Sequence, residues 1–200
     1  MTTQKENKRI TPKGKALYPK LRAPDKFNEA AEPRYKISVQ FDHEGTKYMQ
    51  DLIQKELEKA KGSDKFKGKK WSKNPFLGYS ENDQGEVTFN FYTKAEVVSK
   101  KTQEVFKKPP IPVFDAKLVP FNGVFGNGST VRVDFSPTAY HTSSTVCGVA
   151  LYLNAVQLLE LVEYGSGKNA SDFGFGEEEG FAGEATGFEP DTGDTESDEF

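Results

Sequence analysis

Two segments of the chain alternate between apolar and polar side chains, which is the pattern of a half-buried strand. In residues 34–41, tyrosine, isoleucine, valine and phenylalanine share one side, and Arg34 and Lys36 lie on the other. Residues 87–92 repeat the pattern, with Tyr92 on the polar side. The sequence therefore predicts two strands whose polar faces carry charged and aromatic residues.

Further elements follow from apolar runs and from the residues that interrupt them. Pro19 cannot donate to a β-ladder, so the run that it ends is predicted to be a short edge strand. The last apolar run is apolar on both faces, which is typical of a central strand. Besides the two strands above, the predicted elements are an edge strand at 14–19, a loop at 20–33, an extended piece at 111–114, a strand at 130–135, a central strand at 145–156 and a closing helical turn at 155–162.

One substantial helix is predicted over residues 45–61, because apolar residues recur there at helical spacing and Gly62 follows. About five or six strands with one helix do not alternate as β-α-β units, which argues against a parallel doubly wound sheet. A mainly β fold, as a small mixed or antiparallel barrel, fits this order better.

Charge is divided unevenly along the 200 residues. Residues 1–168 hold all 27 lysines and arginines and 19 of the 30 acids, a formal charge of +8, whereas residues 169–200 hold 11 acids and no basic residue. Such asymmetry points to nucleic-acid contact or to an acidic tail. An acidic tail that only aids solubility is the alternative explanation.

The end of the chain differs from the rest in composition as well as in charge. Residues 165–200 have no apolar periodicity, and their five phenylalanines are isolated among acids and glycines. Low hydrophobicity with high charge cannot offset the entropy cost of ordering, so this segment is predicted to be disordered. The expected organisation is a flexible N-terminus at 1–13, one folded domain at 14–164 and a disordered acidic tail at 165–200.

Residues suited to catalysis or metal binding are scarce. Cys147 is the only cysteine, which excludes an intrachain disulfide and a multi-cysteine zinc site. Asp83, Asp115 and Asp134 lie in separate segments and are better explained as turn or strand-surface carboxylates than as ligands of a shared metal. No apolar run approaches a membrane span, and the N-terminus lacks the apolar core of a signal peptide. We therefore expect a cytoplasmic protein that is not an enzyme and has no cofactor, metal or membrane contact.

Nucleic-acid binding has more support. Residues 61–79 mix six lysines with four aromatic residues, and such a mixture can neutralise phosphates and stack on unpaired bases. The alternatives are a solvated loop with Trp71 folded beneath it as a packing anchor, and strand faces that are merely solvated. The candidate nucleic-acid-binding residues are Arg34, Lys36, Lys67, Lys69, Lys70, Trp71, Tyr92, Lys94, Lys100, Lys101, Arg132 and Tyr140.

Three stretches carry a resemblance to a known family. The stretch GKALYPKLRAPDKFNEAAEPRYKISVQF, followed by a helix and a basic loop with Trp71, resembles phage-encoded single-stranded DNA-binding proteins of replication and recombination. The segment LYLNAVQLLE matches the same pattern, and the ending DTGDTESDEF resembles the acidic tails with a final aromatic residue of phage and bacterial single-stranded DNA-binding proteins. The resemblance covers most of residues 14–164 together with the tail.

The resemblance implies an OB-fold body, a five-stranded barrel that binds single-stranded DNA with little sequence preference. It also implies a homodimer, and a tail in which Asp198, Glu199 and Phe200 recruit replication or recombination proteins. In a bacterial host, such a protein would protect single strands during phage DNA replication and recombination. A tethered tail is also expected to compete with DNA for the basic body. The alternatives are an adaptor whose basic body binds an acidic protein instead of nucleic acid, and a metal-dependent nuclease.

Overall fold

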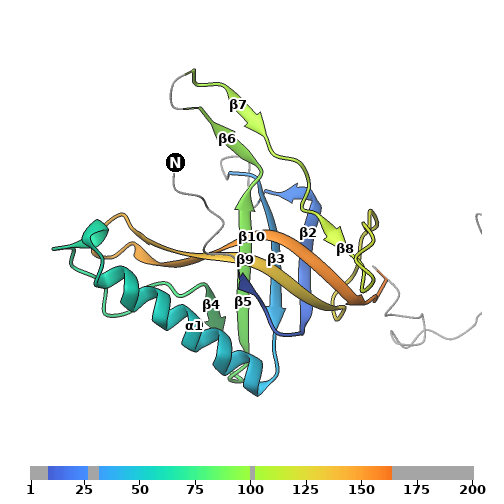
Figure 1. Ribbon diagram of the computed structural model, residues 1–200, viewed down its shortest axis with the longest axis horizontal. Coiled ribbons are helices and arrows are strands. Elements are labelled where there is room, and N and C mark those ends of the chain that lie inside the picture. The colour runs from blue at the N-terminus through green and yellow to red at the C-terminus, as the bar shows by residue number, and fades with distance from the viewer. Residues whose placement is uncertain (1–8, 27–31, 100–101, 164–200) are drawn as a thin grey trace, which may run out of the picture. The chain divides into compact units, whose positions relative to one another are not determined.

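The computed structural model describes residues 9–26, 32–99 and 102–163 (Figure 1). These residues form a mainly β structure with one long helix and a short 3-10 helix. The elements are β1 Arg9–Ile10, β2 Gly14–Asp25, β3 Arg34–Gln40, α1 His43–Lys61, η2 Asp64–Phe66, β4 Tyr79–Glu81, β5 Val87–Lys94, β6 Glu96–Val98, β7 Val105–Lys107, β8 Val113–Phe114, β9 Thr130–His141 and β10 Cys147–Glu160.

Five strands close into a barrel. Strand β2 pairs with β3 and β9, β3 pairs with β5, and β9 pairs with β10, all in antiparallel ladders. The ring closes where β5 and β10 pair in parallel. Closure gives each of these strands a neighbour on both sides, which removes the exposed edges of an open sheet. The predicted OB-fold-like five-stranded barrel is confirmed, and β3 and β5 are its second and third strands.

Alternate side chains of the barrel strands fill its interior. Phe89 and Phe91 of β5 and Phe135 of β9 are fully buried, and the rings of Phe91 and Phe135 meet edge to face with centroids 5.2 Å apart. Burial of each large apolar side chain contributes about 1.5–3 kcal/mol to folding. Because the inward positions supply this core, the outward positions of the same strands can carry polar and charged residues.

Helix α1 joins β3 to β5 and packs one apolar face against β9 and β10 (Figure 1). The Asp42 carboxylate accepts a hydrogen bond from the Gly45 backbone N–H at 2.7 Å and so caps the first turn. The helix begins two residues before the predicted start, and Gly62 ends it as expected. The apolar spacing correctly identified the buried face, which includes Met49, Ile53, Leu57 and Ala60.

The predicted edge strand at 14–19 is wrong, and so is the first part of the predicted loop at 20–33, over residues 20–25. Strand β2 continues to Asp25 and has a neighbour on each side. Its register with β3 shifts between Leu17 and Lys20, and Tyr18 adopts a positive φ of 49°. Pro19, which has no N–H, therefore lies where the ladder is interrupted, and the strand continues past it.

Two other predictions of local structure need correction. The closing helical turn at 155–162 is instead the end of β10, which β8 and β9 pair on its two sides. Part of the N-terminal segment at 1–13 is ordered, because β1 pairs with β9 and Thr11 is fully buried. In addition, the structure has the β6–β7 hairpin, which projects from the barrel, where no element was predicted (Figure 1). The boundary between 14–164 and 165–200 lies at the end of the described residues and stays a prediction.

A close backbone approach at Gly148 attaches the loop before β4 to the start of β10. The Phe76 N–H donates to the Cys147 carbonyl at 3.0 Å, and the Val149 N–H donates to the Phe76 carbonyl at 2.8 Å. A Cβ atom on Gly148 would lie 1.9 Å from the Phe76 oxygen. Cys147 itself is buried, as the sequence predicted for a small core residue.

We expect Gly148→Ala to lower the free energy of unfolding by about 1–3 kcal/mol, because the new methyl group meets backbone that cannot move without breaking these hydrogen bonds. Gly62→Ala is the control, since a Cβ there has only ordinary contacts beyond 3.5 Å, the nearest at 3.7 Å. Urea unfolding of both variants measures the difference. Equal stability of the two variants would contradict this account of Gly148.

Candidate nucleic-acid interface

Outward-facing residues of β3 and β5 line a hollow of about 420 Å³ on the barrel surface. Lys36 lies opposite Tyr92 in the ladder, and Ser38 lies opposite Asn90 and donates to its side-chain oxygen at 2.8 Å. The hollow therefore combines positive charge, amide and hydroxyl groups and an aromatic ring on one surface. Its lining comprises Asp25, Glu32, Arg34, Lys36, Ser38, Asn90, Phe91 and Tyr92.

Tyr92 is held at this surface by a cation and by a second aromatic ring. The Arg34 guanidinium carbon lies 5.0 Å from the Tyr92 ring centroid, within the range of a cation–π contact. Tyr152 lies on β10, the neighbour of β5 on the side away from β3, and its ring centroid is 5.9 Å from that of Tyr92. Burial raises the pKa of the Tyr92 phenol, and Tyr152 adds to this, while Arg34 and Lys94 oppose it. The ring is thus a neutral, partly exposed aromatic surface beside cations.

Tyr152 is not among the candidate residues predicted from the sequence. The last strand was predicted to be apolar on both faces, but Tyr152 is 38% exposed between the buried Leu151 and Leu153. The parallel pairing of β5 with β10 places Tyr152 opposite Tyr92. The only signal for Tyr152 in the sequence was a tyrosine at a position that alternates with apolar residues. That it lies beside Tyr92 of β5 follows from the closure of the barrel.

Two carboxylates neutralise the cations around the hollow. The Asp25 carboxylate lies 2.6 Å from the Lys36 ammonium nitrogen. The Glu32 carboxylate lies 2.7 Å from the ammonium nitrogen of Lys94 and 3.5 Å from the guanidinium of Arg34. The hydrogen bond from Lys94 is the largest influence on Glu32 and lowers the pKa of its carboxyl group, so Glu32 stays ionised at neutral pH.

The basic loop after α1 attaches to the end of the β9–β10 hairpin. The Trp71 ring meets the rings of Phe66 and His141 edge to face, with centroid distances of 5.5 and 5.2 Å. His141 also forms a hydrogen bond of 2.8 Å with the Lys70 carbonyl. Trp71 is therefore a partly buried packing anchor, which was the alternative explanation for this residue, whereas the side chains of Lys67, Lys69 and Lys70 are exposed.

Tyr140 lies beside this loop, one residue before His141 on β9 and opposite Gly148 of β10. It is partly buried, and burial is the main cause that raises the pKa of its phenol. Tyr92 and Tyr152 contribute to the same shift. The end of β9, just before the turn between the fourth and fifth barrel strands, thus presents a tyrosine one residue from the contact of His141 with the basic loop.

The structure does not bring every candidate residue to these surfaces. Arg132 lies on β9, which pairs with β1, β2 and β10 and not with β3 or β5, and its Nε donates to the Thr11 carbonyl at 3.1 Å. Arg132 therefore does not share the face of Arg34 and Lys36, and its role in nucleic-acid binding stays a prediction. Other candidates lie outside the described residues, namely Lys100, Lys101, Asp198, Glu199 and Phe200.

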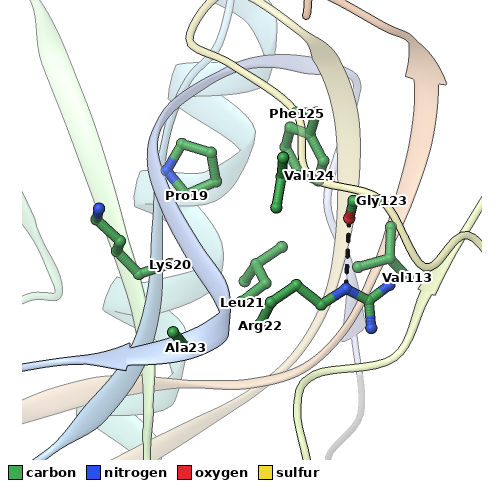
Figure 2. A pocket seen from close by; sticks show the side chains of 9 residues that line it. All are labelled: Pro19, Lys20, Leu21, Arg22, Ala23, Val113, Gly123, Val124 and Phe125. Carbon is green, nitrogen blue, oxygen red and sulfur yellow. Dashed lines mark hydrogen bonds between the residues drawn. The ribbon is translucent and has the colours of Figure 1, made fainter. Parts of the chain in front are cut away.

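A second hollow, of about 310 Å³, lies between β2, β8 and the segment before β9 (Figure 2). Its walls are mostly apolar, with Leu21, Val113 and Phe125 among them. Arg22 is engaged within the fold, since its guanidinium donates to the carbonyls of Phe121 and Gly123. This pocket offers a mostly apolar surface, to which Lys20 adds one cationic side chain.

The described part of the chain shows no group of three or more histidine, cysteine, aspartate or glutamate residues able to hold a metal. Asp115 accepts backbone hydrogen bonds from Lys117 and Val119, and Asp134 accepts one from the Asn154 side chain. The interpretation of these two aspartates as turn and strand-surface residues is confirmed. None of the helices in the described ranges is long and apolar enough to cross a membrane.

Solved structures of other proteins contain a similar barrel. No family model and no curated protein matches the sequence. Among solved structures, the single-stranded DNA-binding protein gp2.5 of bacteriophage T7 aligns with a TM-score of 0.61 and 23% identity, over 88% of this chain and 98% of that chain.

The single-stranded DNA-binding protein of bacteriophage Enc34 is also similar. It aligns with a TM-score of 0.57 and 16% identity over 86% of this chain and 92% of that chain. Its structure in complex with single-stranded DNA aligns with a TM-score of 0.55 and 12% identity, over 81% of this chain and 91% of that chain. The chain therefore has the OB-fold-like architecture of these phage single-stranded DNA-binding proteins.

Proposed function

We propose that this chain binds single-stranded DNA along the outer face of β3 and β5, with little sequence preference, during phage DNA replication and recombination. The observation that carries the proposal is the hollow in which Arg34 and Lys36 flank the ring of Tyr92. OB-folds bind oligonucleotides on the face of their second and third strands and at the loops between strands one and two and strands four and five. In this barrel those strands are β3 and β5, and Tyr140 lies near the end of strand four, just before the turn to strand five.

In the proposed mechanism, cationic side chains bind the phosphates and aromatic rings stack on the bases. Arg34, Lys36 and Lys94 neutralise phosphates, and counterions released from the DNA drive the association. Bases stack on Tyr92 and Tyr152, whose rings form adjacent aromatic surfaces. A duplex hides its base faces, so the stacking contribution is available only to unpaired strands. The exposed lysines of the basic loop extend the positive surface toward Tyr140.

This activity requires binding groups and no catalytic group, so we infer a binding protein and not an enzyme. The tail is proposed to recruit replication or recombination proteins, because its acids and final Phe200 resemble the tails of single-stranded DNA-binding proteins. A homodimer and a place in the cytoplasm of a bacterial host are part of the same proposal. The adaptor alternative predicts no nucleic-acid binding, so a direct titration separates the two functions.

Titration of a fluorescent 30-nucleotide oligo-dT by anisotropy tests the function. We expect binding that is much tighter than to a duplex of equal length and that weakens with salt, with a log–log slope of about −0.7 for each phosphate neutralised. The full-length protein is used at several salt concentrations. Absence of binding, or equal affinity for both DNAs, would contradict the proposal and favour the adaptor.

Tyr92 is expected to contribute through its ring. Replacement by alanine should weaken binding of the oligonucleotide by about 1–3 kcal/mol, because a stacking surface is lost. Tyr92→Phe should keep most of the affinity, since the ring remains. Tyr48→Ala is the control, because Tyr48 is an exposed tyrosine of α1 outside the hollow. A loss in Tyr48→Ala equal to that in Tyr92→Ala would exclude a specific stacking role.

The last residue of the tail is expected to act on proteins and not on DNA. Deletion of Phe200 should leave affinity for oligo-dT unchanged within about twofold, since the deletion removes no charged side chain and no residue of the proposed β3–β5 face. Binding of a replication protein from the same phage, measured by surface plasmon resonance, should weaken. A deletion that changes only DNA affinity would assign Phe200 to the DNA-binding surface instead.

A further inference from the structure

Each cation around the β3–β5 hollow is already paired with a carboxylate of the same chain. Asp25, the last residue of β2, pairs with Lys36, and Glu32, just before β3, pairs with both Lys94 and Arg34. A further ion pair, of Lys15 with Glu160, involves no residue that lines this hollow. Asp25 and Glu32 therefore form ion pairs with all three of the cations that are proposed to contact phosphates.

A carboxylate and a phosphate compete for the same donors. Each presents anionic oxygens that accept charge-assisted hydrogen bonds from ammonium and guanidinium groups. The Lys94 ammonium cannot remain 2.7 Å from Glu32 and also direct all its hydrogen bonds to phosphate. DNA must therefore either displace these carboxylates from the cations or share the cations with them.

The exchange is feasible because these ion pairs are exposed. The side chains of Glu32 and Lys94 are 56% and 50% exposed, and those of Lys36 and Arg34 are each 45% exposed. Exposed ion pairs contribute little to folding and are screened by salt. Opening them leaves the barrel core intact, because none of the buried core residues belongs to these pairs.

We infer that Asp25 and Glu32 are built-in competitors of the DNA phosphates: these two acids hold Lys36, Lys94 and Arg34 in ion pairs until single-stranded DNA displaces them. This inference rests on the proposed function and identifies two residues that set its affinity. The lowered pKa of the Glu32 carboxyl group keeps the competitor ionised at neutral pH. The acids make an encounter with phosphate alone less favourable, so that stacking on Tyr92 and Tyr152 supplies much of the net binding.

The two acids also affect the salt dependence. Each carboxylate that DNA displaces becomes free to attract a cation from solution, which offsets part of the counterion release from DNA. Removal of the carboxylate charge should therefore make the log–log slope steeper. At high salt, where both the ion pairs and the DNA contacts are screened, the affinities of the variant and the original protein should converge.

The test compares Glu32→Gln with Glu81→Gln in full-length protein. Glu81 lies on β4 opposite Val87, at the far end of β5 from Lys94, and takes no part in the ion pairs of the described residues. Both substitutions change the net charge equally. We expect Glu32→Gln to bind oligo-dT about three- to tenfold more tightly at low salt with a steeper slope, and Glu81→Gln to differ from the original protein by less than about twofold. Asp25→Asn should act in the same direction as Glu32→Gln.

The outcomes separate this inference from the proposed function. If Glu32→Gln binds oligo-dT no more tightly than Glu81→Gln, or more weakly, Glu32 positions the cations and does not compete with phosphate, and the inference is overturned while DNA binding stands. If the original protein and both variants fail to bind oligo-dT, the proposed function itself fails. Thermal unfolding of all variants checks that the fold is retained.

Discussion

The parallel pairing of β5 with β10 is the contact on which the rest of the structure depends. It closes the barrel between strands that are more than fifty residues apart in the sequence, and it aligns Leu151 with Phe91 on the inside and Tyr152 with Tyr92 on the outside. One register thus determines both the core and the aromatic surface. A shift by one residue would exchange the two sides, because neighbouring side chains in a strand point in opposite directions.

The same closed barrel explains how a small protein can devote a whole strand face to polar groups. Its interior is filled from one side of each strand, with Phe89, Phe91 and Phe135 fully buried. The outer sides of β3 and β5 then carry Arg34, Lys36 and Tyr92 without disturbing the core. The arrangement agrees with the similarity to phage single-stranded DNA-binding proteins and gives the proposed function a defined surface.

Electrostatics divide the proposed surface into two kinds of group. Lysine and arginine side chains attract phosphates, while Asp25 and Glu32 hold the same side chains in ion pairs. The aromatic rings take no part in this competition. They add a stacking contribution to the binding free energy, which depends on exposed bases. Affinity in such a surface is a balance between cations, carboxylates and rings, and each of the three can be changed without altering the barrel core.

The sequence by itself determined the features that depend on local pattern. Strict alternation identified β3 and β5 together with their wet faces, and helical spacing identified the buried side of α1. It also selected Arg34, Lys36, Tyr92 and Lys94, which surround the hollow. Predictions from local pattern were wrong where strand pairing decides the structure. Pro19 lies inside β2 because the ladder is interrupted at that point. The end of β10 is a strand because β8 and β9 pair with it.

Only the tertiary structure decided which outward residues meet. Strand neighbours in a barrel are set by long-range register, so the sequence could not place Tyr152 beside Tyr92 or separate Arg132 from Arg34. Nor could it show that the loop with Phe66 and Trp71 packs against His141, since His141 lies on β9, far along the chain from this loop. The pairing of Glu32 with Lys94 spans 62 residues and is equally hidden, because charges along a chain give no distance in space.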